Sequence, residues 1–300
     1  MQDNFITIVE VGPRDGFQSI KEWIPTDIKL AIINALYEAG VKNMEVGAFV
    51  SPKAIEQMKD ASTIVETLRG KPMTVLVPNL HGAKATYEAG ADSITYVVSV
   101  SPSHNKANVR RTPQESLEAL REIKQSYPSL HVRLALATSF GCPFDGDVPV
   151  SAVANMVTIG QKLGVDEICL ADTIGIANPA QMRKTLKALM PQIDRPLGVH
   201  LHDTRGMGLA NANVAVEEGV RMVESAVGGL GGCPFAPGAA GNIASEDLVN
   251  MLHSMGYKTG IDLEKLLHVS DLIKEKITPT LFSRMANLPK STCEGVSCGK

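Results

Sequence analysis

Short apolar runs alternate with longer amphipathic segments along most of this chain. Eight runs rich in Val, Ile and Leu predict buried strands at residues 5–10, 43–46, 73–77, 93–99, 131–137, 167–171, 198–201 and 222–226. Helical periodicity follows each run, at residues 26–39, 61–68, 82–89, 113–125, 150–163, 180–190, 208–218 and 245–255. A longer loop is predicted between the fourth strand and its helix, and residues 263–282 predict one or two further helices.

This rhythm determines the expected fold class. Strands that alternate with helices indicate a parallel sheet covered on both faces. Eight such units predict a closed (β/α)8 TIM barrel with extra C-terminal helices. An open doubly wound sheet is the alternative, but no Gly-x-Gly-x-x-Gly motif follows the first strand, so a dinucleotide-binding fold is poorly supported. We expect a single catalytic domain over residues 1–285 and a tail over residues 286–300.

Composition narrows the class of protein. Hydrophobic residues make up 44% of the 300 positions, enough for a large core, and the net charge of −3 gives no electrostatic reason to expect nucleic acid or a membrane surface. No apolar run approaches the ~20 residues of a membrane-spanning helix, and no basic-then-apolar signal opens the chain. We therefore expect a soluble, cytoplasmic protein. The cysteines are too scattered for a disulfide framework, so we expect reduced thiols at Cys142, Cys169, Cys233, Cys293 and Cys298.

Two histidines suggest a metal site. Reactive groups of a (β/α)8 barrel belong at the carboxyl ends of its strands. His200 and His202 lie two positions apart on the seventh predicted strand and would face the same side. With Asp15 after the first strand and the amide oxygen of Asn242, they form a nitrogen and oxygen donor set that suits Mg²⁺ or Mn²⁺, and Zn²⁺ would also accept the histidines. The alternative is that both are half-buried strand residues.

Further reactive side chains occupy the same predicted edge. Arg14 precedes Asp15 and could form only a structural ion pair with it. The second strand carries Glu45, which could be only a structural carboxylate. Asp172 and Thr173 follow the sixth strand and could merely cap the next helix. Cys233 lies in a glycine-rich loop and has no second Cys or His at ligand spacing, so we interpret it as a reactive thiol.

Three motifs together resemble one family. They are Val-Gly-Pro-Arg-Asp-Gly at residues 11–16, His-x-His-Asp at 200–203 and Gly-Gly-Leu-Gly-Gly-Cys-Pro-Phe at 228–235. They are similar to those of the 3-hydroxy-3-methylglutaryl-CoA (HMG-CoA) lyase family, which belongs to a superfamily of metal-dependent barrels with isopropylmalate and homocitrate synthases. The resemblance extends to about residue 267. It implies divalent-metal-dependent retro-Claisen cleavage of a 3-hydroxyacyl-CoA into acetyl-CoA and a keto acid such as acetoacetate, a step of leucine degradation.

The resemblance also implies roles for individual residues. The metal ligands would be Asp15, His200, His202 and Asn242. The catalytic residues would be Arg14, which polarises the thioester carbonyl, Cys233 on a closing loop, and Glu45 and Asp172 as supporting or general-base carboxylates. Substrate contacts are expected from Arg14, Thr173 and Lys21, the last as a candidate for the CoA phosphates. The expected partners are an acyl-CoA and a second copy of the chain in a homodimer.

Several departures from the family's pattern concern the substrate. Where the family has two threonines and a serine after the second-strand glutamate, this chain has Val46, Gly47, Ala48 and Phe49. Leu201 and Arg205 also depart from the usual His-Cys-His-Asp-Thr-Tyr-Gly. These changes predict a roomier, less polar wall and make a different 3-hydroxyacyl-CoA an alternative substrate. Two further functions stay open: a carboligase working in the Claisen direction, and a non-catalytic barrel that binds CoA esters.

Overall fold

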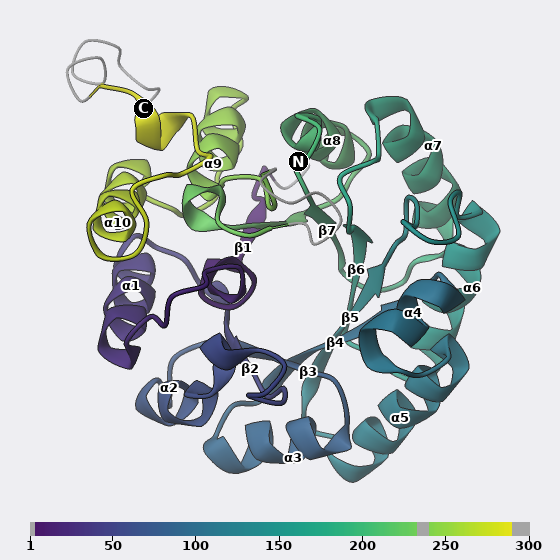
Figure 1. The fold of residues 1–300 in the computed structure, drawn as a ribbon. Helices are drawn as coiled ribbons and strands as arrows, with labels where there is room; N and C mark the ends of the chain where they lie inside the picture. The colour runs from purple at the N-terminus through teal and green to yellow at the C-terminus, as the bar shows by residue number, and fades with distance from the viewer. Residues whose placement is uncertain (1–3, 233–239, 290–300) are drawn as a thin grey trace.

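Eight parallel strands pair in chain order, and the first pairs with the last to close a barrel (Figure 1). The computed structural model describes residues 4–232 and 240–289. The strands are β1 Thr7–Glu10, β2 Asn43–Ala48, β3 Thr74–Val77, β4 Ser93–Ser99, β5 His131–Ala137, β6 Glu167–Asp172, β7 Leu197–Leu201 and β8 Met222–Ser225. The predicted TIM barrel is confirmed.

The helices form an outer ring around these strands. In the described ranges they are α1 Thr26–Glu38, α2 Ala61–Thr67, α3 Leu80–Ala89, α4 Pro102–Val109, α5 Pro113–Ser126, α6 Val150–Lys162, α7 Pro179–Leu189, α8 Gly208–Glu217, α9 Ser245–Ser254 and α10 Leu263–Lys276. Short helical turns occur at Gly12–Gly16, Glu56–Met58, Met190–Gln192, Val227–Gly229 and Met285–Asn287. No described helix is both long enough and apolar enough to cross a membrane.

The prediction of a loop between β4 and the helix that follows it was wrong in part, because this segment contains the helix α4. Its residues carry no apolar stripe that would predict a helix. The helix is instead fixed by its start: the Ser101 hydroxyl accepts a hydrogen bond from the His104 amide, and Pro102 occupies the first turn. Arg110 ends it in the left-handed region at φ 59°.

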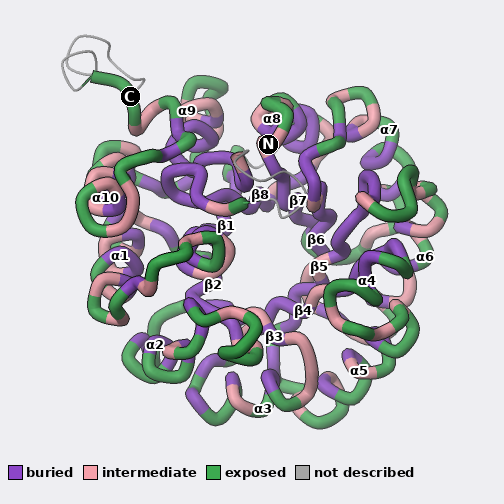
Figure 2. Tube along the Cα trace, viewed as in Figure 1, coloured by how far each residue is buried: buried purple, intermediate pink, exposed green. Residues whose placement is uncertain are grey.

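The apolar core lies between the strands and the helices (Figure 2). On β5 the side chains of Val132, Leu134 and Leu136 are fully buried in this layer. Alternation therefore turns Arg133, Ala135 and Ala137 toward the barrel interior. Strand β5 thus presents one face to the helices and the other to the barrel interior.

The buried carboxylate of Glu10 holds the turn after β1 in place by hydrogen bonds. Glu10 Oε1 accepts hydrogen bonds from the amides of Gly12 at 2.7 Å and Val227 at 2.8 Å, and Oε2 accepts one from the Ser245 hydroxyl at 2.5 Å. Burial raises the pKa of Glu10 to about 7, against the lowering effect of these donors. Glu10 therefore ties the turn that carries Arg14 to the chain that follows β8.

The C-terminal part continues past the barrel. Helix α10 packs beside α1, and the turn Met285–Asn287 follows it (Figure 1). The last eleven residues of the expected tail, 290–300, lie outside the described residues.

Candidate active site and metal centre

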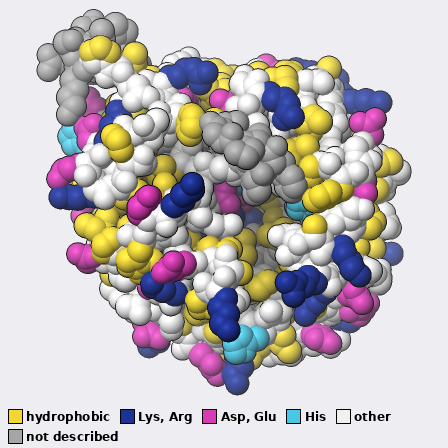
Figure 3. Space-filling model, in the orientation of Figure 1, with side chains coloured by type: hydrophobic (Ala, Val, Ile, Leu, Met, Phe, Trp, Pro, Cys, Tyr) yellow, Lys and Arg dark blue, Asp and Glu magenta, His cyan; other side chains and the backbone are white. Residues whose placement is uncertain are grey.

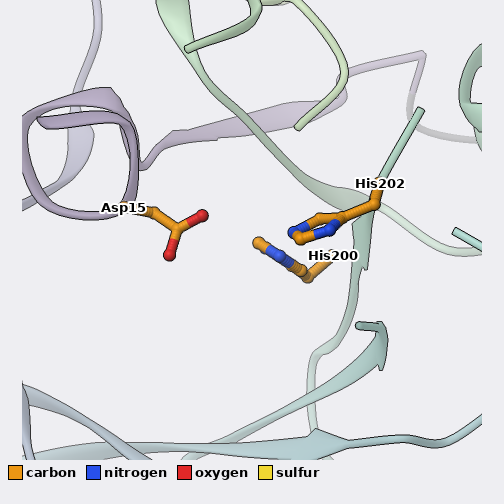
Figure 4. A group of neighbouring side chains, drawn as sticks. All are labelled: Asp15, His200 and His202. Carbon is orange, nitrogen blue, oxygen red and sulfur yellow. The ribbon is translucent and has the colours of Figure 1, made fainter. Parts of the chain in front are cut away.

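Asp15, His200 and His202 converge at the carboxyl end of the barrel. One ligand atom from each lies within 4.8 Å of the others. Figure 4 shows the imidazoles of His200, on β7, and of His202, just past its end, with the carboxylate of Asp15 facing them from the turn after β1. The arrangement matches the alternation expected of His-x-His at a strand end, and it can hold a divalent cation.

Asn242 lies beside this cluster. It forms an isolated antiparallel bridge with His202, and its Nδ2 donates to Asp15 Oδ2 at 2.7 Å and to the Leu230 carbonyl at 3.0 Å. Asn242 Oδ1 and His202 Nδ1 are buried and have no hydrogen-bond partner in the described part of the chain. Because buried polar atoms are normally satisfied, these two orphans fit a site that binds a cation through oxygen and nitrogen donors.

Glu224 on β8 is a functional candidate that the sequence reasoning missed. Its Oε2 lies 2.9 Å from His200 Nδ1, so His200 can present Nε2 toward Asp15. Although burial opposes the charged form, this carboxylate raises the pKa of His200. Burial and the neighbouring His200 lower the pKa of His202 to about 4, which leaves it a neutral ligand at physiological pH.

Arg14 lies between two carboxylates at the mouth of the barrel. Its Nε and Nη2 donate to Glu45 Oε2, both at 2.7 Å, and its Nη1 contacts Asp15 Oδ1. Burial opposes the charge, but Asp15 and Glu45 raise the pKa of Arg14 above its usual range. Burial likewise opposes ionisation of Asp15, yet Arg14 and the histidines hold its pKa well below its usual range. The site therefore keeps a guanidinium and a carboxylate charged side by side.

These groups line one cavity of about 820 Å³ at the carboxyl ends of the strands. Figure 3 shows the molecule hollowed on this face. Its lining includes six of the predicted residues and the missed Glu224: Arg14, Asp15, Glu45, Thr173, His200, His202 and Glu224. A cavity of this size with a few converging polar groups is typical of a small-molecule site.

The other candidate residues, Asp172, Lys21 and Cys233, are not among the described residues that line the cavity. The two carboxylate oxygens of Asp172 accept hydrogen bonds from the backbone amides of Ile176 at 2.9 Å and Ala177 at 3.0 Å. Asp172 therefore holds the loop after β6 and does not cap α7 directly. Burial raises the pKa of Asp172. Lys21 is exposed and is not among the described residues that line the cavity. Cys233 lies outside the described residues.

The residues that depart from the family's pattern do not line the described cavity. The expectation that they give the cavity a roomier, less polar wall was therefore wrong in detail. A Cβ on Gly47 would meet Ala61 of α2 at 3.5 Å, because the register shifts between Glu45 and Gly47 and turns this position outward. Ala48 is buried and does not line the described cavity. Arg205 donates to the backbone carbonyls of Ile174 and Gly175, at 2.7 and 3.2 Å. Its guanidinium therefore braces a loop.

Comparison with known proteins agrees with this geometry. The model of the HMGL-like family matches residues 5–273. The chain is similar to the hydroxymethylglutaryl-CoA lyase of Bacillus subtilis, with 39% identity covering 96% of this chain and 98% of that protein. It is also 39% identical to the mitochondrial enzyme of Mus musculus, over 96% and 90% of the two chains. A solved HMG-CoA lyase of A. baumannii, in complex with coenzyme A and 3-methylmalate, superposes with a TM-score of 0.91 at 41% identity over 96% of each chain.

Proposed function

Because this chain belongs to the HMGL-like family, we propose that it is a lyase that cleaves HMG-CoA, or a close relative, into acetyl-CoA and a keto acid such as acetoacetate. The observation that carries the proposal is the convergence of Asp15, His200 and His202 beside the guanidinium of Arg14 in one cavity. A cation site next to a fixed positive charge is what this cleavage requires.

The reaction breaks the bond between C2 and C3 of the thioester. The C3 hydroxyl loses its proton and becomes a ketone, while the electron pair of the broken bond passes to C2 and forms a thioester enolate. A proton then adds to C2 and gives acetyl-CoA. Residues of this site therefore have to accept one proton, stabilise one developing oxyanion and donate one proton.

We assign the cation to Asp15, His200, His202 and Asn242, with Mg²⁺ or Mn²⁺ as the natural ion. An ion held by these residues would lower the pKa of the substrate hydroxyl and would orient it. His200 is oriented by Glu224, and His202 is kept neutral by burial, so both imidazoles are ready to act as ligands.

Arg14 stabilises the enolate oxygen in this scheme. Its guanidinium is held by Glu45 and Asp15 and needs no rearrangement when negative charge develops at the thioester. Cys233 supplies the proton to C2 from the glycine-rich loop, because a thiol with an ordinary pKa of about 8.5 exchanges protons readily near neutrality. These two roles account for the second half of the reaction.

The carboxylates divide between support and proton transfer. Glu45 Oε1 is buried without a hydrogen-bond partner among the described residues, so Glu45 is the better placed general base. Asp172, whose oxygens are both occupied by backbone amides, positions Thr173 at the cavity wall. Lys21 meets the CoA phosphates only if the CoA moiety extends beyond the described cavity. We also propose that the enzyme forms a homodimer.

A panel of 3-hydroxyacyl-CoA thioesters, assayed for acetyl-CoA release with Mg²⁺ or Mn²⁺, tests the proposal. We expect release from HMG-CoA or a close relative, and its loss when a chelator removes the ion. The His202→Ala variant should fold and lose both the bound ion and nearly all turnover. Absence of release from every thioester by metal-loaded protein would reject the lyase assignment.

A further inference from the structure

The strands that line the cavity at the barrel mouth form two chemically different groups. The strands β7, β8, β1 and β2 and the turns after them contribute ionisable groups: His200, His202, Glu224, Arg14, Asp15 and Glu45. Across the ring, the inward-facing side chains of β3 to β6 contribute an apolar wall: Leu76, Val97, Ala135, Ala137 and Ala171. Two ionisable residues from the segment after β4, His104 and Arg111, also line the cavity. Figure 2 shows the two groups of strands on opposite sides of the barrel. A ligand that fills the cavity therefore meets hydrocarbon along the inner faces of β3 to β6, and ionisable groups along β7, β8, β1 and β2.

The apolar wall faces open space rather than packed protein. Val97 and Ala135 are paired across β4 and β5, and both are half-buried, whereas their outward neighbours Val98 and Leu136 are fully buried. Small side chains at Ala135 and Ala137 leave room in front of β5, directly across the barrel from β1. Their exposure to the cavity indicates that a ligand covers this hydrocarbon surface when it binds.

A buried hydroxyl in the same wall supports this interpretation. Thr95 is 2% exposed, lines the cavity, and lies one inward-facing position deeper than Val97 on β4. Its Oγ1 has no hydrogen-bond partner anywhere in the described chain. Buried hydroxyls are normally hydrogen-bonded, so this unpaired oxygen points to a polar ligand atom that reaches it.

We propose that the wall of Leu76, Val97, Ala135, Ala137 and Ala171, with Thr95 at its inner end, binds the C3 substituent of the substrate. The preferred substrate is a 3-hydroxyacyl-CoA whose C3 substituent is longer than methyl and ends in a hydrogen-bonding group. This inference rests on the proposed lyase function. The hydroxyl, the distal carboxylate and the thioester carbonyl all need the ionisable side, so the C3 substituent is the part left for the apolar side.

Binding can be measured separately from cleavage. The probes are 3-methyl-, 3-propyl- and 3-(3-hydroxypropyl)glutaryl-CoA, which lack the C3 hydroxyl and cannot be cleaved. Burying two more methylenes should tighten binding of the propyl analogue up to about 15-fold over the methyl analogue, from about fourfold per methylene. The hydroxypropyl analogue should bind several-fold more tightly than the propyl analogue. Calorimetric titration of the metal-loaded protein gives the three dissociation constants.

Two variants and a control locate the effect. Ala135→Leu fills the apolar side and should abolish the preference for propyl while leaving the methyl analogue within about twofold. Thr95→Val keeps the shape and should remove only the advantage of the terminal hydroxyl. Ala188→Leu makes the same change as the first variant at an exposed residue of α7 that does not line the cavity, and should change none of the ratios.

The outcomes separate the inference from the proposed function. Equal binding of the methyl and propyl analogues would overturn the pocket, and equal binding of propyl and hydroxypropyl would overturn the role of Thr95. Turnover of the matching 3-hydroxy thioesters is assayed in parallel. If none releases acetyl-CoA, the lyase assignment fails, while the order of analogue binding still reports on the wall.

Discussion

Glu224 gives the sharpest test of how the cation site is built. The Glu224→Gln substitution keeps the shape and lets the amide oxygen still accept from His200 Nδ1, which lies 2.9 Å from Glu224 Oε2. It removes the negative charge that raises the pKa of His200 and strengthens it as a ligand. Loss of such a partner typically weakens metal binding by about 10- to 100-fold, or about 1.4–2.7 kcal/mol. We expect a loss in that range.

The measurement is a titration of metal-free protein with Mn²⁺, in which electron paramagnetic resonance reports the free ion. Glu167→Gln is the matched control. Glu167 lies on β6, which neighbours β7, and its Oε2 accepts a hydrogen bond from Arg133 Nε at 2.7 Å, but it does not contact His200. Circular dichroism should show both variants folded. A Mn²⁺ dissociation constant for Glu224→Gln within twofold of the wild type would show that the His200 contact does not tune the site.

Three more predictions concern the catalytic machinery and its support. Arg14→Met should lower kcat by about 10³-fold with little change in KM, since the guanidinium acts on charge that develops in the transition state; an effect on KM alone would make Arg14 a binding residue. Burial raises the pKa of Glu10 in the folded protein to about 7 from an ordinary value of 4.5, so its proton stabilises the native state fully below pH 4.5, and that contribution is lost as pH rises through 7. Glu10→Gln should flatten the decline of the unfolding free energy with pH, measured in urea, and an unchanged slope would mean that Glu10 is already ionised. Cys233 should be alkylated by iodoacetamide faster than the buried Cys142 and Cys169 and be protected by a CoA ester, and Cys233→Ala should keep the metal and lose most turnover; peptide mapping that shows equal labelling with and without the ester would make Cys233 a bystander.

The barrel could be predicted because its signal is repeated eight times. Alternating strand and helix patterns are local, and closure follows from their number. The pair His200 and His202 could be assigned to one face for the same reason, since the period of a strand is two. Asp15 could be added because it follows the first strand at the edge where reactive groups of such a barrel gather.

The rest of the site depends on register, which the sequence does not display. Glu224 lies in the short run of β8, and only the pairing of β7 with β8 places it opposite His200. The irregular pairing after Glu45 turns Gly47 outward, so the expected contribution of this position to the cavity wall was wrong. Part of the apolar wall follows from alternation, because Ala135 and Ala137 alternate with the larger apolar residues Leu134 and Leu136 on β5.

The contact between Asn242 and Asp15 joins positions that are 227 residues apart. It crosses the seam where β8 closes against β1, so the proposed cation site contains both the beginning and the late part of the polypeptide. At the usual ribosomal rate of about 5–20 residues per second, about 10–45 seconds pass between the synthesis of the two residues. A nascent chain cannot assemble this ligand set early. Uptake of the ion would therefore report that the barrel has closed, which makes it a direct probe of the last step of folding.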